Sequence, residues 1–206
     1  MSENTSWTSL LTADPRMALV PCAVELLAGG KPVPLPRLAA AAGWPTDEVE
    51  TALRGIPRVD FDGAGNLIGL GLTLARTAHH VRVDGRELFT WCAMDAVGLP
   101  VMLGRAVIVE STCPATEAPI LLNLSPAGLD SASPAETVVG EVAPTVGCTD
   151  IRTSVCDHGH FFAGPAAAER WRQQHPTGHV RPVVEAFEIT RARLQQIGWV
   201  SGGAGS

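Results

Sequence analysis

Cys92 and Asp95 form the first pair in this 206-residue chain whose types and spacing could perform chemistry. The pattern predicts a strand that reaches Thr90, followed by a turn into a short helix that ends near residues 98–100. Cys92 would lie in the first helical turn, where the helix dipole favours a thiolate, and Asp95 would share its face. A nearby carboxylate, however, raises the pKa of a thiol, so the pair fits a proton relay better than a simple nucleophile. The plain alternative is a buried cysteine beside an aspartate that caps the helix.

A second group of polar residues surrounds Cys156, which we expect at the end of a strand. His158 and His160 follow it closely, and a Cys/His site for zinc or copper is one interpretation. The paired CxxC spacing of zinc sites is absent, so we favour histidines that bind turn backbone and pack near the following phenylalanines. If Cys156 approaches Cys92 in the fold, two thiols and a carboxylate would make a site for soft ions such as Hg(II) or Cu(I).

The cysteine count indicates free thiols. An odd number is spread along a chain too long for a disulfide-stapled miniprotein: Cys22, Cys92, Cys113, Cys148 and Cys156. Tyrosine is absent, so no phenol is available as an acid or base. The first eleven residues lack the basic and apolar regions of a signal peptide, and the most apolar stretch, 93–109, is too interrupted to span a membrane. We therefore expect a soluble, cytoplasmic protein that has no membrane partner.

The first third of the chain predicts three helices and a hairpin. The helices cover residues 17–28, 35–42 and 47–55, the last one capped by Thr46, and the hairpin covers 59–68. This is a winged-helix arrangement, which often binds DNA. The third helix, however, carries Asp47, Glu48 and Glu50 against Arg54, and the chain has a net charge of −6 with no basic run. We expect no nucleic-acid partner and interpret the helices as a cap on the rest of the chain.

Beyond residue 72 the pattern is typical of an antiparallel sheet. Short apolar runs separated by Pro, Gly and Ser predict strands at 106–110, 120–124 and 137–142. Helices are predicted at 166–174 and 190–196, with a strand at 183–189 between them and a frayed tail at 201–206. The fold class is α+β: a winged-helix-like domain over residues 1–76 and a mixed or antiparallel sheet domain with flanking helices over residues 77–206.

Four stretches of the chain resemble the alkylmercury (organomercurial) lyase family. Their order and spacing are those of the family, and the likeness runs from about residue 17 to residue 187. The WCxxD element and the cysteine–histidine element around Cys156 are specific in combination. The stretches are GNLIGLGLTL, LFTWCAMDAVGLPVMLGR, ESTCPATEAPI and TSVCDHGHFF.

The resemblance implies cytosolic cleavage of a carbon–mercury bond by protonolysis, with no organic cofactor. Its roles fall on Cys92, Asp95 and Cys156, which would also hold the Hg(II) product. The substrate would be an organomercurial, and cellular thiols or a mercuric reductase would accept the Hg(II). The family's fold, a winged-helix-like domain joined to a sheet domain, agrees with the elements predicted above.

The implied chemistry requires an unusual aspartate. Two thiolates on mercury push electron density toward carbon, and Asp95, holding a proton taken from a cysteine, could then protonate that carbon. The pKa of Asp95 must therefore be raised, by an apolar pocket or by a neighbouring thiolate. Candidate lining residues, each of which could equally be ordinary core, are Trp91, Met94, Leu99, Phe161 and Phe162.

The remaining cysteines match the family less closely. Cys113 stands where the family often has a cysteine and is expected to be structural, whereas Cys22 and Cys148 match no motif. Asp157 stands where some members carry another cysteine, which puts the route of Hg(II) release in doubt. Leu70 replaces an expected aromatic residue.

Two other functions remain open from the residues. The first is a thiol-based mercury-binding or metal-responsive regulatory protein that uses Cys92 and Cys156 as ligands. The second is a redox protein that cycles a disulfide between these two cysteines. The acidic third helix disfavours a regulator, and the lack of a CxxC motif disfavours a redox dithiol. Only carbon–mercury cleavage needs the proton of Asp95.

Overall fold

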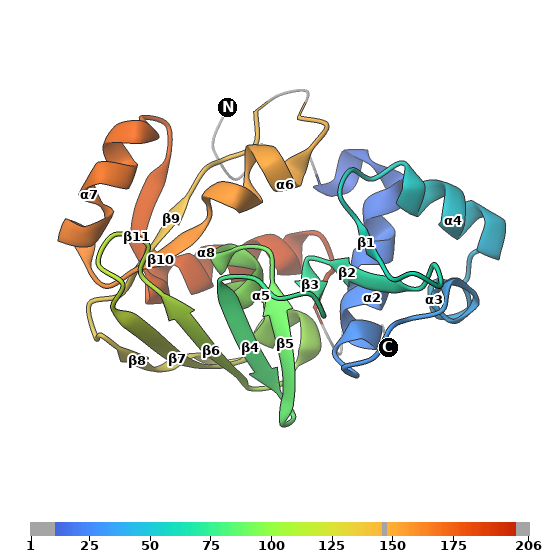
Figure 1. The fold of residues 1–206 in the computed structure, drawn as a ribbon, viewed down its shortest axis with the longest axis horizontal. Helices are drawn as coiled ribbons and strands as arrows, with labels where there is room; N and C mark the ends of the chain where they lie inside the picture. Colours follow the sequence, from blue (N-terminus) through green and yellow to red (C-terminus); the bar gives the residue numbers. More distant parts are fainter. Residues whose placement is uncertain (1–10, 146–147, 201–206) are drawn as a thin grey trace.

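The computed structural model describes residues 11–145 and 148–200. The expectations for the first ten residues and for the 201–206 tail lie outside this described part. Within it, the chain forms a helical end, a long antiparallel sheet, and a smaller sheet with four further helices around the two sheets (Figure 1). The predicted α+β class is confirmed.

The helical end contains the predicted helices and hairpin. The third helix begins one residue earlier than expected, so Thr46 is its first residue, and Pro45 occupies the N-cap position without a side-chain bond. Acidic residues in its first turn suit the positive end of the helix dipole. The elements are η1 (Pro15–Ala18), α2 (Leu19–Leu27), α3 (Leu35–Ala42), α4 (Thr46–Arg54), β1 (Asp60–Phe61) and β2 (Leu67–Leu70).

The hairpin β1–β2, the wing of the helical end, continues directly into the larger sheet. This sheet has eight strands in the order β1-β2-β3-β5-β4-β6-β7-β8, and every neighbouring pair is antiparallel. In β6 and β7 buried positions alternate with more exposed ones, so one face of the sheet packs on the core. The further strands are β3 (Leu72–Thr73), β4 (His79–Val83), β5 (Arg86–Thr90), β6 (Val107–Thr112), β7 (Pro119–Ser125) and β8 (Gly128–Ser133).

The smaller sheet is also antiparallel, with the order β10-β9-β11. Its strands are β9 (Val138–Glu141), β10 (His160–Phe162) and β11 (His179–Pro182), and helix α7 (Pro165–Gln174) packs on it. Two short elements, α6 (Ile151–Ser154) and η2 (Cys156–His158), connect β9 to β10. Cys156 therefore begins a 3-10 turn, and the expectation that it ends a strand is wrong.

Two helices connect the sheets. Helix α5 (Ala93–Leu103) contacts strands of both sheets as well as α2, and it packs most extensively on α8 (Val183–Gln196). Helix α5 continues past Pro100, so the expected end near residues 98–100 is wrong. The predicted strand at 183–189 is also wrong. Its buried side chains recur at the three- and four-residue spacing of a helix: Val183, Ala186, Phe187, Thr190 and Leu194.

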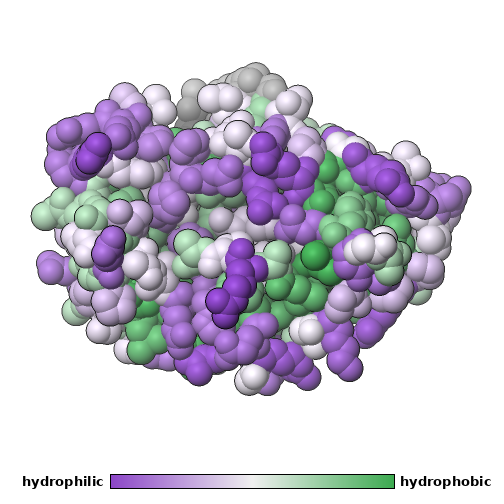
Figure 2. Space-filling view, in the orientation of Figure 1, coloured by the Kyte–Doolittle hydropathy of each residue, from purple (hydrophilic) through white to green (hydrophobic). Residues whose placement is uncertain are grey.

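The surface differs between the two ends of the molecule. In Figure 2, the left half of this face mixes hydrophilic, neutral and hydrophobic side chains, and the most continuous hydrophobic area lies right of centre, beside the helical end. Among the described residues, no helix is long and apolar enough to cross a membrane.

Candidate active site

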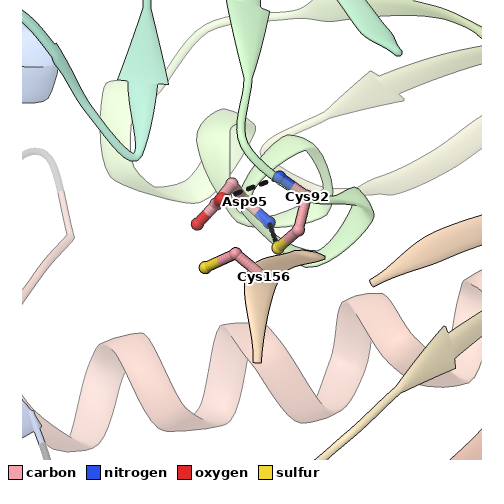
Figure 3. A group of neighbouring side chains, drawn as sticks. All are labelled: Cys92, Asp95 and Cys156. Carbon is pink, nitrogen blue, oxygen red and sulfur yellow. Dashed lines mark hydrogen bonds between the residues drawn. The ribbon is translucent and has the colours of Figure 1, made fainter. Parts of the chain in front are cut away.

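Cys92 lies where the chain leaves strand β5 and enters helix α5. It is the N-cap residue of α5, with an extended backbone, so it precedes the first helical turn in which it was expected. The backbone N–H of Asp95 donates to the Cys92 sulfur at 3.4 Å, and the N–H of Cys92 donates to Asp95 Oδ2 at 3.1 Å (Figure 3). This reciprocal capping box fixes the thiol and the carboxylate against each other.

The segment that carries Cys156 is joined to the same turn by Gly159. The carbonyl of Gly159 accepts the N–H of Ala93, the first residue of α5, at 3.1 Å. It also accepts Nε2–H of buried His79 at 3.2 Å. A Cβ at Gly159 would lie 2.9 Å from Cys92 Cβ, so this close approach requires glycine.

The fold brings the three predicted site residues together. One ligand atom each from Cys92, Asp95 and Cys156 lies within 4.8 Å of the others, and within residues 11–145 and 148–200 no other group of three potential metal ligands is as compact. The cysteines are 4% and 6% exposed. In Figure 3 the Cys156 side chain approaches the start of α5 from a separate segment. Two sulfurs, the ligands that soft metal ions prefer, therefore lie close together beside one carboxylate oxygen.

The protonation of these groups departs from ordinary values. The pKa of Cys92 is raised by its hydrogen bond with Cys156, by burial and by the charge of Asp95. This direction favours a thiol at Cys92, as expected from the neighbouring carboxylate, and the opposing effect of the helix dipole does not prevail. Burial also raises the pKa of Asp95, against the opposing effects of its hydrogen bonds to Cys92 and the charge of Arg152. This shift has the direction that protonation of a carbon atom by Asp95 requires.

A cavity of about 150 Å³ opens beside the three residues, and most of its wall is apolar. Trp91, Met94 and Leu99 line it as expected, and Leu70 joins them. Phe161 and Phe162 are 0% and 1% exposed and do not line it, so they are ordinary core, the alternative given for them above. An apolar wall suits a hydrocarbon group and excludes water from the reacting atoms.

Charged residues that the sequence reasoning missed also line this cavity. Glu141 and Arg193 are buried, and Arg193 Nη1 donates to Glu141 Oε1 at 2.6 Å. Arg181 Nη1 donates to the other carboxylate oxygen at 3.3 Å. Burying a carboxylate is costly unless it is paired, and these arginines satisfy it. Only the fold brings β9, β11 and α8 together, so no sequence signal identifies the group.

A further missed group lies on the wing side of the site. Asp60 of β1 accepts hydrogen bonds from the Trp91 indole and from Arg152 of α6, and the Arg152 guanidinium lies 4.6 Å from the Trp91 ring centroid. Trp91 immediately precedes Cys92. The signal in the sequence was its WCxxD element, but the partners of the tryptophan are distant in the chain.

The other candidates lie outside the three-residue group. Cys113 is buried, as a structural role predicts, and the half-buried Cys22 donates to the Ala41 carbonyl at 3.7 Å. His175 Nδ1 donates to the Trp171 carbonyl, so its Nε2 accepts from His158 Nδ1 at 3.1 Å. In the described ranges, neither His158 nor His160 forms a three-ligand group with Cys156.

Known proteins are similar to this chain in sequence and in fold. A family model described as alkylmercury lyase matches residues 72–195, and one described as the helix-turn-helix domain of alkylmercury lyase matches residues 11–71. The chain is 44% identical to an alkylmercury lyase of Bacillus cereus over 168 residues, which are 82% of this chain and 77% of that protein. It is 38% identical to an alkylmercury lyase of Staphylococcus epidermidis over 182 residues, 87% and 84% of the two chains. The crystal structure of the mercury-bound form of MerB2 superposes with a TM-score of 0.74, at 24% identity, over 95% of this chain and 98% of that one.

Proposed function

This chain belongs to the alkylmercury lyase family and cleaves the carbon–mercury bond of organomercurials, and we propose that Cys92, Asp95 and Cys156 carry out that cleavage. The observation that supports the assignment is the convergence of two buried thiols and one carboxyl within 4.8 Å at the wall of an apolar cavity. Thiols bind mercury, and the carboxyl moves a proton.

The first step loads the substrate. Cys92 rests as a thiol because its pKa is raised, so it needs a base before it can bind mercury. The carboxylate of Asp95 takes that proton, and the Cys92 sulfur replaces the ligand that accompanied the organomercurial cation. Cys156 then binds the same mercury, and its proton leaves with the displaced ligand. The organic group lies in the apolar cavity.

The second step cleaves the bond. Two sulfur ligands raise the electron density on carbon, and the Asp95 carboxyl gives its proton to that carbon. The electron pair of the carbon–mercury bond becomes the new carbon–hydrogen bond. Mercury stays in the +2 state and remains on Cys92 and Cys156, while Asp95 returns to a carboxylate. Neither an oxidant nor an organic cofactor enters the proposed reaction.

Release of Hg(II) completes the proposed cycle. Because Asp157 stands beside Cys156 in place of a further thiol, we propose that cellular thiols or a mercuric reductase take the metal directly from the two-cysteine site. Free cysteines throughout the described chain fit a reducing, cytoplasmic location. We propose no nucleic-acid role for the helical end, whose helix α4 carries acidic residues in its first turn.

The test is to incubate the reduced protein with phenylmercury and measure benzene by gas chromatography. Asp95→Asn should bind phenylmercury and release benzene at least about a hundredfold more slowly, the scale of a lost general acid. Cys156→Ser should lose turnover, and Cys22→Ser should match the parent as the thiol control. Parental turnover of Asp95→Asn contradicts the relay, and parental turnover of Cys156→Ser contradicts the two-thiol site. A parent protein that binds phenylmercury without releasing benzene would indicate a mercury-binding protein instead.

A further inference from the structure

The wing of the helical end is tied to the short segment that leads into Cys156. Asp60 Oδ1 accepts Arg152 Nη1–H at 2.9 Å, and the same nitrogen donates to the Arg58 carbonyl at 3.2 Å. Arg58 in turn pairs with Asp150 at 3.0 Å. Asp150 is the N-cap of α6, and Arg152 lies inside that helix, so the wing contacts the element directly before Cys156.

The same carboxylate also contacts the turn that carries Cys92. Asp60 Oδ2 accepts the indole N–H of Trp91 at 3.0 Å. Trp91 is 9% exposed and lies between the Arg152 guanidinium, 4.6 Å from its ring centroid, and the cavity. A cation over an indole face is favourable, so Arg152 and Trp91 support each other while Asp60 holds both.

The surroundings of Asp60 leave room for these bonds. Gly69 is its partner across the hairpin, and a Cβ there would lie 2.5 Å from Asp60 Oδ2. Thr73 Oγ1 adds a further hydrogen bond to Oδ2 at 3.1 Å. The side chains of Asp60 and Arg152 are only 22% and 24% exposed, so solvent screens this pair less than an ordinary surface ion pair. Donors from three separate segments thus converge on one carboxylate of the wing.

We propose that Asp60 is a positioning residue that fixes the Cys92 turn through Trp91 and the Cys156 segment through Arg152, so that the two sulfurs face one mercury ion. The wing then connects the two halves of the site, which are the Cys92 turn and the Cys156 segment. This inference rests on the proposed roles of Cys92, Asp95 and Cys156.

The decisive variant is Asp60→Asn, which keeps the size of the side chain but removes its charge and one acceptor. We expect kcat for benzene release from phenylmercury to fall about ten- to hundredfold, the usual cost of losing a group that orients metal ligands. The KM for phenylmercury should change much less than kcat, since both thiols are retained. Asp60→Glu, which keeps the charge of the side chain, should recover part of the lost rate.

Asp62→Asn is the matched control, because Asp62 is a half-buried aspartate in the turn of the same hairpin, and its carboxylate accepts hydrogen bonds from Ala64 and Asn66 of that turn. Parental kcat in Asp60→Asn overturns the inference, as does a rate loss that Asp62→Asn shares or one that Asp60→Glu does not relieve. These outcomes leave the catalytic assignment intact, because Asp95→Asn tests that assignment separately in the same assay.

Discussion

The Cys92 thiol and the Asp95 carboxylate each cap helix α5 and also take part in the proposed reaction. The Cys92 sulfur accepts the N–H of Asp95 as a helix cap, a position where serine, threonine, aspartate or asparagine is usual. Because sulfur is a weak acceptor, the thiol retains its capacity to bind mercury. The carboxylate that completes the cap is also the proposed base for that thiol. The geometry that begins helix α5 is therefore the geometry of the proposed proton transfer.

The charge of Asp95 is one of the causes that raise the pKa of Cys92. Removing that charge should therefore make Cys92 easier to alkylate, even though it slows benzene release. In Asp95→Asn the thiol should ionise at lower pH than in the parent. Alkylation of Cys92 by iodoacetamide, followed by mass spectrometry across a pH series, should therefore begin at lower pH in the variant, although the variant releases benzene slowly. An unchanged or higher onset would contradict the proposed coupling between the thiol and the carboxylate.

At the scale of elements, the turn between η2 and β10 decides how closely Cys156 approaches Cys92. Its Gly159 carbonyl accepts N–H groups from α5 and from His79 of β4, so three elements meet at one peptide. Burying a carbonyl whose hydrogen bonds are satisfied costs little free energy of folding. The donors are a backbone N–H and a rigid histidine ring, so no long flexible side chain is needed for the contact. The distance between the two thiols therefore depends on the backbone of this turn.

Gly159→Ala should separate these elements. The new Cβ would lie 2.9 Å from Cys92 Cβ and 3.4 Å from its sulfur, so the turn must shift. We expect benzene release to fall at least about tenfold, because small misplacements of reacting groups are costly, while the number of titratable thiols stays the same. Gly63→Ala is the control, since a Cβ there meets nothing within 4 Å. Equal activity of the two variants would show that the close approach at Gly159 is dispensable.

The sequence predicted those elements whose signals are local. The helix Leu35–Ala42 has a proline within its first turn and a glycine with φ of 69° after its end, and the hairpin has its Gly/Asn turn. The residues of the reacting group were also predicted, because the WCxxD element and the Cys156 element are specific together. That their sulfurs meet depends on Gly159 and His79, which carry no such signal.

The errors have a common physical cause, which is competition between local pattern and tertiary packing. The β-branched start of α8 resembled a strand, but its buried face has helical spacing and packs on α5. Pro100 suggested a helix end, yet α5 continues to Leu103 before Gly104 adopts a left-handed conformation. Asp60 and Arg152 belong to no motif in the sequence, and only the position of the wing beside α6 gives them partners. The division at residues 76 and 77 stays a prediction.

At the scale of the whole molecule, a continuous antiparallel sheet joins the wing to the strands behind the active site. His79 lies near the middle of this arrangement, 3% exposed, where β4 meets the Cys156 turn. Its Nε2 donates to the Gly159 carbonyl, and in the neutral ring Nδ1 is an acceptor for the Ser111 hydroxyl at 3.0 Å, whose one hydrogen also has the Ala78 carbonyl within reach at 3.2 Å. Both ring nitrogens are satisfied without a positive charge, and the site is attached to the core by a neutral histidine.

That neutrality makes the stability of the protein depend on pH. Burial, assisted by the nearby His160, lowers the pKa of His79 to about 4, although its bond to Gly159 acts in the opposite direction. The unfolded chain takes up the proton near pH 6.5, whereas the folded protein resists it until about pH 4. The free energy of unfolding should therefore decrease as pH falls from about 6.5 to 4, by up to about 3 kcal/mol from His79 alone. Urea unfolding at several pH values measures this slope.

His79→Gln removes the titrating group while retaining an amide that can bond the Gly159 carbonyl. The variant should be less stable than the parent at pH 7, because its shorter side chain fills the site less well, but its stability should fall less between pH 6.5 and 4. The comparison uses the change of the free energy of unfolding with pH, so a loss of packing that lowers stability equally at every pH does not affect it. Burial also lowers the pKa of His160, so part of the dependence of stability on pH should remain in both proteins. If the variant loses as much free energy over this range as the parent, the neutral His79 is not the source of the acid sensitivity.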